Sequence, residues 1–188
     1  MKEREPQVLD LEKIIRSRAG SKAKYIPQFL INWFKKIAHQ DYINGYLKEG
    51  YVGVDFCENC LGYLGVEIEV KGLENLPDNG RVYTFASNHP LGAIDGVTLG
   101  AIIGRKYDGK VKYLLNDLLM NLKGMAPLGI PVNKIGGQAR NLPRLLDEAF
   151  RSDNHMLVFP AGLCSRKIDG KIQDIEWGKA FITKSRQT

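Results

Sequence analysis

Long apolar runs are missing from this chain of 188 residues. No uninterrupted apolar segment reaches the roughly 18 residues that suggest a transmembrane helix, so a membrane-spanning protein is not expected. The first residues, MKEREPQ, carry charges of both signs and no apolar segment follows them directly, which argues against a secretory signal peptide. Internal repeats and low-complexity linkers are missing as well. With 44% hydrophobic residues, the chain is long enough to bury one good core.

Cysteine and histidine are scarce, with three of each. Cys57 and Cys60 form a C-x-x-C pair, but the chain has no second pair to complete a zinc site. The surrounding pattern predicts a helix, so we interpret both as half-buried helix residues rather than as redox groups. His39 is expected near a helix end and His155 at the exposed mouth of a strand, and neither receives a catalytic role. So few cysteines favour a reducing compartment.

The segment Thr84–Gly96, TFASNHPLGAIDG, carries the clearest chemical signal. Residues 81–86 are β-branched, aromatic and apolar enough for a buried strand, Pro-Leu-Gly then supplies a turn, and an apolar helix follows. His89 is expected where the strand ends and Asp95 about one turn into the following element. This placement suits a general base whose imidazole is held in one tautomer by a carboxylate. Taken alone, however, such a pair is more often a structural or capping arrangement.

A second segment adds a possible anion site. His155–Phe159 predicts another short apolar strand, and it leads into the sequence PAGLCSRK. A Pro-x-Gly bend followed by serine, arginine and lysine presents backbone amides beside cationic donors. Proteins hold oxyanions, phosphates and carboxylates with such groups.

Together, the two segments resemble the signatures of the glycerolipid acyltransferase family, whose members acylate glycerol phosphate, lysophosphatidate and other lyso-lipids. The family patterns NHxxxxD and FPEGxxSR compare with Asn88–Asp95 and Phe159–Arg166. Between them, Gly129–Lys134 stands where the family carries a strand and an arginine that contacts the acceptor phosphate. The chain looks closest to a bacterial, hemolysin-like subgroup with NHPLG and FPAG variants. That subgroup includes O-acyltransferases that complete ornithine or glycine aminolipids.

Three departures from the family pattern bear on the chemistry. His89 and Asp95 are separated by five residues rather than four, so Gly92 is expected to absorb the extra residue in a bulge or tight turn. Ala161 stands in place of a glutamate, and Lys134 in place of an arginine. Because lysine lacks the bidentate fork of arginine, a phosphate monoester is less favoured as the acceptor headgroup. A lysophosphatidate-like lipid and an N-acyl aminolipid both stay open.

The resemblance implies an O-acyltransferase that moves a fatty acyl group from a thioester of acyl carrier protein or coenzyme A to a hydroxyl of a lyso-lipid. His89 would remove the hydroxyl proton, and Asp95 would orient and stabilise the histidine. Oxyanion donors would come from the backbone or from the bend at Gly162. No bound metal or redox cofactor is implied. Substrate binding is assigned to the other motif residues: Asn88, Lys134, Gly162, Ser165 and Arg166.

A basic amphipathic helix is predicted within residues 25–37. Its apolar positions recur at helical spacing, and four lysines lie beside or before it. One interpretation packs this helix on the catalytic core. The other lays Phe29, Trp33 and Phe34 into a bilayer, since a lipid-modifying enzyme without a transmembrane segment needs some such device.

The remaining pattern alternates strands with helices, which predicts an α/β fold with a mostly parallel central sheet flanked by helices. Strands are expected at Val66–Val70 and Val111–Leu115, and helices at 117–123, 138–151 and from residue 176. We expect an N-terminal helical extension, residues 1–62, and an acyltransferase α/β domain, residues 63–188. Because the family domain continues into further strands, truncation of this domain at its C-terminus is one interpretation of its end.

Two other functions stay open. An esterase or thioesterase would use the same dyad with water as the acceptor, and the missing G-x-S-x-G pattern argues only against serine hydrolases with a nucleophile elbow. A peripheral membrane-binding module would keep the dyad as a structural pair. The net charge of +6 favours an anionic partner, either a bilayer surface or an acidic acyl carrier, while nucleic-acid motifs are missing. We expect a peripheral location at the cytoplasmic face of a bacterial cell membrane.

Overall fold

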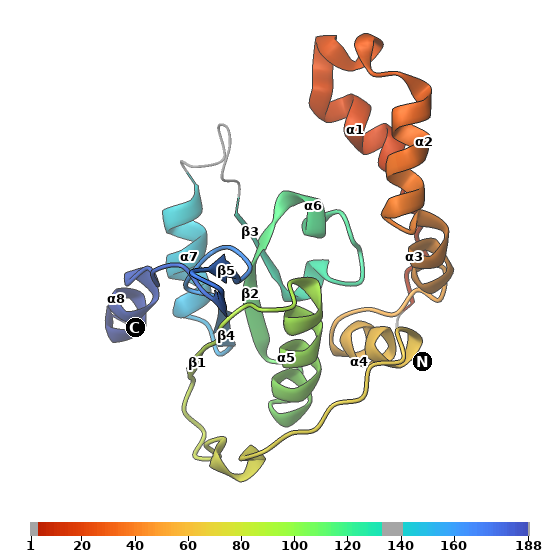
Figure 1. The fold of residues 1–188 in the computed structure, drawn as a ribbon. Coiled ribbons are helices and arrows are strands. Elements are labelled where there is room, and N and C mark those ends of the chain that lie inside the picture. Colours follow the sequence, from red (N-terminus) through yellow and green to blue (C-terminus); the bar gives the residue numbers. More distant parts are fainter. Residues whose placement is uncertain (1–3, 133–140, 188) are drawn as a thin grey trace. The chain divides into compact units, whose positions relative to one another are not determined.

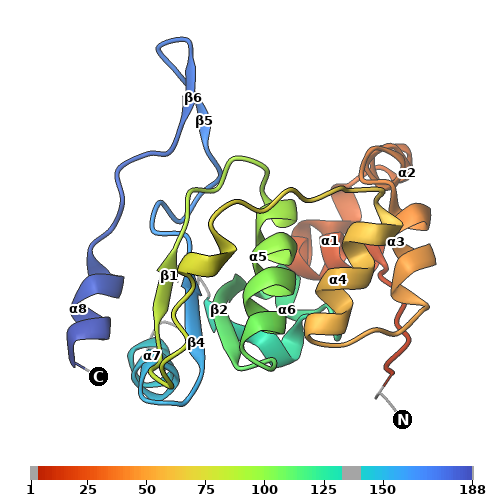
Figure 2. The ribbon, with the colours of Figure 1, turned by 90° about the horizontal axis from the view of Figure 1, so that it is seen from below.

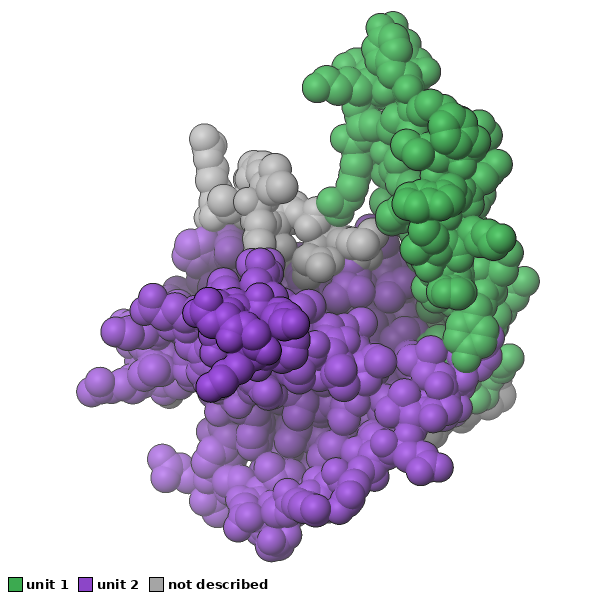
Figure 3. Space-filling view, in the orientation of Figure 1, with its two compact units in different colours: residues 1–51 green, residues 52–188 purple. Residues whose placement is uncertain are grey.

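The structure, a computed structural model, describes residues 4–132 and 141–187. The chain divides into two compact units, Met1–Tyr51 and Val52–Thr188 (Figure 3). Helix α4 (Val54–Tyr63) belongs to the second unit.

The first unit is helical. It contains α1 (Leu11–Ala19), a 3-10 helix η1 (Gly20–Tyr25), α2 (Gln28–Ile37) and α3 (Gln40–Leu47) (Figure 1). Asp10 caps α1 by accepting a hydrogen bond from the backbone amide of Lys13 at 3.1 Å. Pro27 precedes α2, where its fixed φ and missing N–H disturb no helical hydrogen bond. These local signals divide the unit into short helices that must be held together by side chains.

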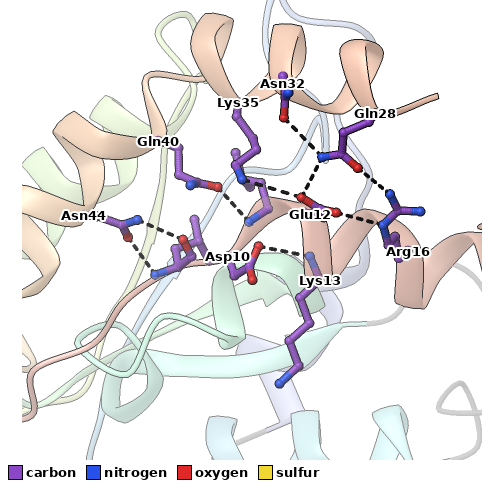
Figure 4. A network of polar contacts seen from close by, with 11 residues as sticks. Asp10, Glu12, Lys13, Arg16, Gln28, Asn32, Lys35, Gln40 and Asn44 are labelled. Atoms are coloured by element: carbon purple, nitrogen blue, oxygen red, sulfur yellow. Dashed lines mark hydrogen bonds and ion pairs between the residues drawn. The ribbon is translucent and has the colours of Figure 1, made fainter. Parts of the chain in front are cut away.

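A polar network joins α1 to one edge of α2 (Figure 4). Glu12 accepts hydrogen bonds from Arg16 and Gln28, each at 3.0 Å, and its Oε2 lies 3.7 Å from Lys35 Nζ. On α3, the buried Asn44 exchanges two hydrogen bonds with the backbone of Leu9, at 2.7 and 2.9 Å. The polar edge of α2 is therefore tied to α1 through Gln28 and Lys35. These contacts set the direction in which the apolar face of α2 points.

The second unit is built on a sheet of four parallel strands in the order β1-β4-β2-β3. The strands are β1 (Thr84–Ala86), β2 (Val111–Asn116), β3 (Gly129–Val132) and β4 (His155–Val158). The predicted α/β class with a mostly parallel sheet is confirmed. A two-stranded antiparallel hairpin, β5 (Arg166–Ile168) and β6 (Lys171–Gln173), projects away from this sheet (Figure 2).

Helices cover both faces of the sheet. On one face, α7 (Leu142–Phe150) packs Leu145, Leu146 and Phe150 against Ile130 and Met156. On the other, α5 (Ala93–Lys106) lies over β2, on the side of Tyr113. Strand register separates the two faces, because Tyr113 pairs with Leu157 while Met156 pairs with its neighbour Lys112. The remaining elements of the unit are η2 (Leu73–Asn75), α6 (Asp117–Met120), η3 (Ala126–Leu128) and α8 (Ala180–Gln187).

Glycines allow α4 and α5 to approach closely. A Cβ atom placed on Gly100 would lie 2.6 Å from Tyr113 Oη and 2.8 Å from Cys57 Sγ. Gly104 is equally tight, since its Cβ would lie 2.6 Å from Cγ2 of Val54. A methyl group fits at neither position without movement of the neighbours. This contact helps to set the position of Asp95, which lies in the first turn of α5.

Some sequence-based expectations were wrong. Residues 66–70 form no strand, and Ile68 and Val70 stay 40% and 42% exposed. The alternating pattern there was typical of a half-buried strand, but both of the sheets formed by the described residues exclude the segment. His155 was expected at an exposed strand mouth, yet it is buried among Tyr83, Phe85 and Tyr107. The last helix begins at Ala180 rather than near residue 176.

Within residues 4–132 and 141–187, none of the helices combines the length and the apolar character needed to cross a bilayer.

Gly100→Ala should lower the free energy of unfolding by about 1–3 kcal/mol, because the added methyl group overpacks the contact with Tyr113 and Cys57. Gly96→Ala is the matched control on the same helix, since its Cβ would meet no atom within 4 Å. The control should gain up to about 1 kcal/mol from helix propensity. Urea denaturation of both variants measures the difference. Equal stability of the two would contradict the packing described here.

Burial should make His155 a source of acid sensitivity. Desolvation, with a smaller effect of Lys110, lowers the pKa of His155 from its ordinary 6.5, and its Nδ1 accepts a hydrogen bond from the Tyr83 amide. The folded state therefore favours the neutral ring. The contribution of His155 to the free energy of unfolding is therefore complete above pH 6.5. It decreases as the pH falls below that value, because the unfolded chain then binds the proton more readily than the folded chain does.

His155→Asn keeps an acceptor for the Tyr83 amide but removes the titration. Unfolding free energies measured at pH 7.5 and pH 5.5 should therefore differ less in this variant than in the wild type. His39→Asn, at an exposed histidine, should keep the wild-type difference. A wild-type slope in His155→Asn would show that other groups cause the acid sensitivity.

Candidate active site

The turn between β1 and α5 places His89 and Asp95 on one local element. The strand ends at Ala86, and the helix begins at Ala93. Gly92, at the N-cap of α5, has φ 67° and ψ −125°, a conformation that residues with a Cβ rarely adopt. The expected tight turn at Gly92 is confirmed. The turn lies between the histidine and the aspartate, as the expectation requires.

His89 and Asp95 form a close, half-enclosed pair. Nδ1 of His89 lies 3.0 Å from Oδ2 of Asp95, and their side chains are 19% and 13% exposed. The same carboxylate oxygen accepts the backbone amide of Leu91 at 2.8 Å. An ionised carboxylate only accepts hydrogen bonds, so this contact places the ring proton on Nδ1 and leaves Nε2 as an acceptor. The pair has the arrangement of a base with an orienting carboxylate.

The segment after β4 closes over the histidine. Because β1 and β4 are parallel neighbours, their carboxyl ends meet at the same edge of the sheet. The ring of Phe159 stacks on His89 with centroids 4.1 Å apart, and the backbone amide of Ser165 donates to the His89 carbonyl at 2.8 Å. The two motifs, separated by more than sixty residues, therefore form one site.

The residues assigned to substrate binding differ in their exposure and in their contacts. Asn88 and Arg166 are exposed, with Arg166 at the start of the hairpin. Gly162 has φ 66°, and its amide donates to the Phe159 carbonyl at 2.8 Å within the bend. Ser165 points its hydroxyl to Asp174. Lys134 lies outside the described residues.

Asp174 and Trp177 belong to this site, although neither had been singled out from the sequence. Asp174 Oδ2 accepts the indole N–H of Trp177 at 2.8 Å, and its Oδ1 is 3.4 Å from the His89 amide. No family pattern pointed to them, because they follow the second motif at no signature spacing. Only the return of the chain after the hairpin brings Asp174 to His89, with Trp177 bound to Asp174.

The described parts of the chain contain no group of three or more histidine, cysteine, aspartate or glutamate side chains that could hold a metal ion.

Comparison with known proteins shows the family of this chain. A family model described as "Acyltransferase" matches residues 13–188. The chain belongs to this acyltransferase family. The match includes both motif segments and extends through helices of the first unit. The family resemblance inferred from the two motifs is thereby confirmed.

Two curated proteins are similar to nearly the whole of this chain. A protein of Phocaeicola vulgatus named "Lyso-glycine lipid O-acyltransferase" is 55% identical over 183 residues, which cover 96% of this chain and 65% of that protein. A protein of the same name from Bacteroides thetaiotaomicron is 56% identical over 182 residues, covering 96% and 66%. The chain thus spans about two thirds of the length of these relatives. No solved structure matches it.

Cys164 should be the thiol of this acyltransferase chain that reacts first. It is exposed, and its Sγ would lie 3.4 Å from a Cβ on Gly92. Burial raises the pKa of Cys57 to about 12 and that of Cys60 to about 11, so neither forms the reactive thiolate at neutral pH. Brief alkylation at pH 7.5 followed by peptide mass spectrometry should find the label on Cys164. Equal labelling in the presence of denaturant is the control, and native labelling of Cys57 would contradict its burial.

Proposed function

We propose that this protein is an O-acyltransferase that transfers a fatty acyl group from a thioester to a hydroxyl of a lyso-lipid. The observation that carries the proposal is the 3.0 Å contact between His89 and Asp95 in the motif that defines the family resemblance. The acyl donor is a thioester of acyl carrier protein or coenzyme A, which acts as co-substrate rather than as a bound cofactor. The two relatives support a glycine lipid as the acceptor, since both are named for one.

His89 acts as the general base in this proposal. Its Nε2 removes the proton as the acceptor hydroxyl attacks the thioester carbonyl, and Asp95 stabilises the imidazolium that forms. The proton then passes from the imidazolium to the departing thiolate as the tetrahedral intermediate collapses. Phe159 limits rotation of the ring by stacking on it. No residue forms a covalent bond to the acyl group in this sequence.

The cationic groups beside this site suit the phosphates of the donor or an anionic headgroup. Arg166 and Lys167 open the exposed hairpin that follows the Ser165 segment, which itself contacts His89. A glycine lipid carries a carboxylate, which arginine can bind through two parallel hydrogen bonds. Lys134, outside the described residues, keeps its assignment to the same task as part of this proposal, together with Asn88.

Replacement of the dyad tests the reaction. His89→Ala should lower kcat by about 10²–10⁴-fold, the usual contribution of a general base, and Asp95→Asn should also lower it by disturbing the tautomer. The assay supplies acyl carrier protein or coenzyme A thioesters with N-acyl glycine, N-acyl ornithine or lysophosphatidate, and mass spectrometry identifies the product. His39→Asn controls for loss of an unrelated histidine. Free fatty acid as the sole product would identify a hydrolase, and full activity of His89→Ala would reject the mechanism.

The proposal also includes peripheral attachment at the cytoplasmic face of the membrane through α2. Phe29, Trp33 and Phe34 are 70%, 58% and 46% exposed. Gln28 and Lys35, by contrast, face the network around Glu12. A soluble amphipathic helix usually turns its apolar face inward, so this opposite arrangement supports insertion of the apolar face at a bilayer surface. The flanking lysines would contact anionic headgroups.

A variant with Phe29, Trp33 and Phe34 all changed to serine should sediment with anionic liposomes at least about tenfold less than the wild type, because buried apolar area drives interfacial binding. Val8→Ser is the control, since Val8 is an equally exposed apolar residue of the same unit. Circular dichroism verifies that the triple variant keeps its helices. Undiminished sedimentation would contradict the assignment of this face to the membrane.

A further inference from the structure

Asp174 gathers donors from three separate segments. The residue directly follows the hairpin, after β6 ends at Gln173. One carboxylate oxygen accepts the hydroxyl of Ser165 and lies 3.4 Å from the backbone nitrogen of His89. The other oxygen accepts the indole N–H of Trp177 at 2.8 Å. A carboxylate is suited to this position because all three partners donate and it only accepts.

Both the backbone N–H and the backbone carbonyl of His89 have hydrogen-bond partners. Its N–H faces Asp174, and its carbonyl accepts the backbone amide of Ser165 at 2.8 Å. Ser165 itself is bound to Asp174 through its hydroxyl. The three residues form a closed arrangement that includes the backbone of His89 but not its ring. The ring is fixed separately, by Asp95 and Phe159.

The charge state of Asp174 agrees with this arrangement. The hydrogen bond from Ser165 is the largest of the effects that lower the pKa of Asp174, and bonds from Trp177 and the His89 amide act in the same direction. The carboxylate is therefore ionised at neutral pH. In that form it offers acceptors to all of its neighbours and has no proton of its own to donate.

We propose that Asp174 is a positioning residue for acyl transfer, which holds the backbone of His89 against the Ser165 segment so that the imidazole meets the acceptor hydroxyl. The inference rests on the proposed function, because it assigns Asp174 a role through His89. Asp174 touches the backbone of His89 and not the reacting atoms. Small displacements of a catalytic group, of about 1 Å, are enough to lower rates about 100-fold.

Steady-state kinetics of the full-length protein separate positioning from substrate binding. Asp174→Ala should lower kcat by about 10- to 100-fold and leave the KM for thioester and for lyso-lipid within about twofold. Asp169→Asn is the matched control, since it removes an exposed aspartate at the turn of the same hairpin. The control should keep the wild-type kcat. Amide hydrogen exchange should become faster at His89 and Ser165 in Asp174→Ala.

A second pair of variants keeps the test valid if Asp174→Ala does not fold. Asparagine keeps one acceptor oxygen for Ser165 and His89 but turns an NH₂ group toward the indole N–H of Trp177. Asp174→Asn should therefore be impaired in kcat. Adding Trp177→Phe removes the opposing donor, so the double variant should be more active than Asp174→Asn alone. Such a recovery is not expected if Asp174 serves only as a negative charge.

The outcomes distinguish this inference from the proposed function. If His89→Ala abolishes transfer while Asp174→Ala keeps the wild-type kcat, the positioning role is overturned and the general-base mechanism stands. An increase in KM with unchanged kcat would likewise overturn it and make Asp174 a substrate-binding residue. If His89→Ala stays active, the proposed mechanism fails whatever the Asp174 variants do.

Discussion

The parallel pairing of β1 with β4 is the constraint on which the candidate site depends. Thr84, Phe85 and Ala86 pair in register with Met156, Leu157 and Val158, so the two strands end at the same edge of the sheet. Each strand leads directly into one of the two motif segments. The bond from the Ser165 amide to the His89 carbonyl continues the contact between the two chain segments beyond the sheet. A shift of this register would separate the histidine from Phe159 and from the cationic segment that follows it.

The second constraint is the close packing beneath α5. Asp95 lies in the first turn of that helix, and its distance to His89 depends on where the helix begins and how it sits on the sheet. Gly100 and Gly104 let α5 lie close to Cys57 and Val54 on α4 and to Tyr113 in the sheet. Glycine costs helix propensity at these positions, which is compensated by the close contact it allows. The geometry of the His89–Asp95 pair therefore depends on how α5 packs on α4 and on the sheet.

The first unit shows a different balance of forces. Its polar network binds one edge of α2 through Glu12 and Gln28, while Ile31 supplies the buried apolar contact of the helix at 1% exposure. The large aromatic residues Phe29 and Trp33 stay outward. Solvent-exposed ion pairs contribute little stability, so the network acts chiefly through the direction it gives the helix. The proposed attachment to a bilayer is assigned to this exposed aromatic face.

The features that could be predicted from the sequence are those that depend on residues close together along the chain. Short patterns predicted the parallel α/β class, the turn between His89 and Asp95, the tight turn at Gly92 and the exit of β4 into the second motif. They could do so because strand, turn and helix preferences act over a few residues. The pattern at residues 66–70 misled because alternation cannot show whether a partner strand exists. His155 was misplaced because its burial depends on aromatic rings from residues 83, 85 and 107.

Tertiary structure alone decided the remainder of the site. Asp174 and Trp177 carry no motif. Asp174 reaches His89 only because the hairpin reverses the chain after Ser165, and Trp177 donates to Asp174. The outward orientation of the apolar face of α2 depended on polar partners in α1. The periodicity of the α2 sequence could not reveal these partners. Local preferences place His89 beside Asp95. Contacts between distant segments hold the backbone of His89, and only the tertiary structure decides them, because such hydrogen bonds form once the chain has folded.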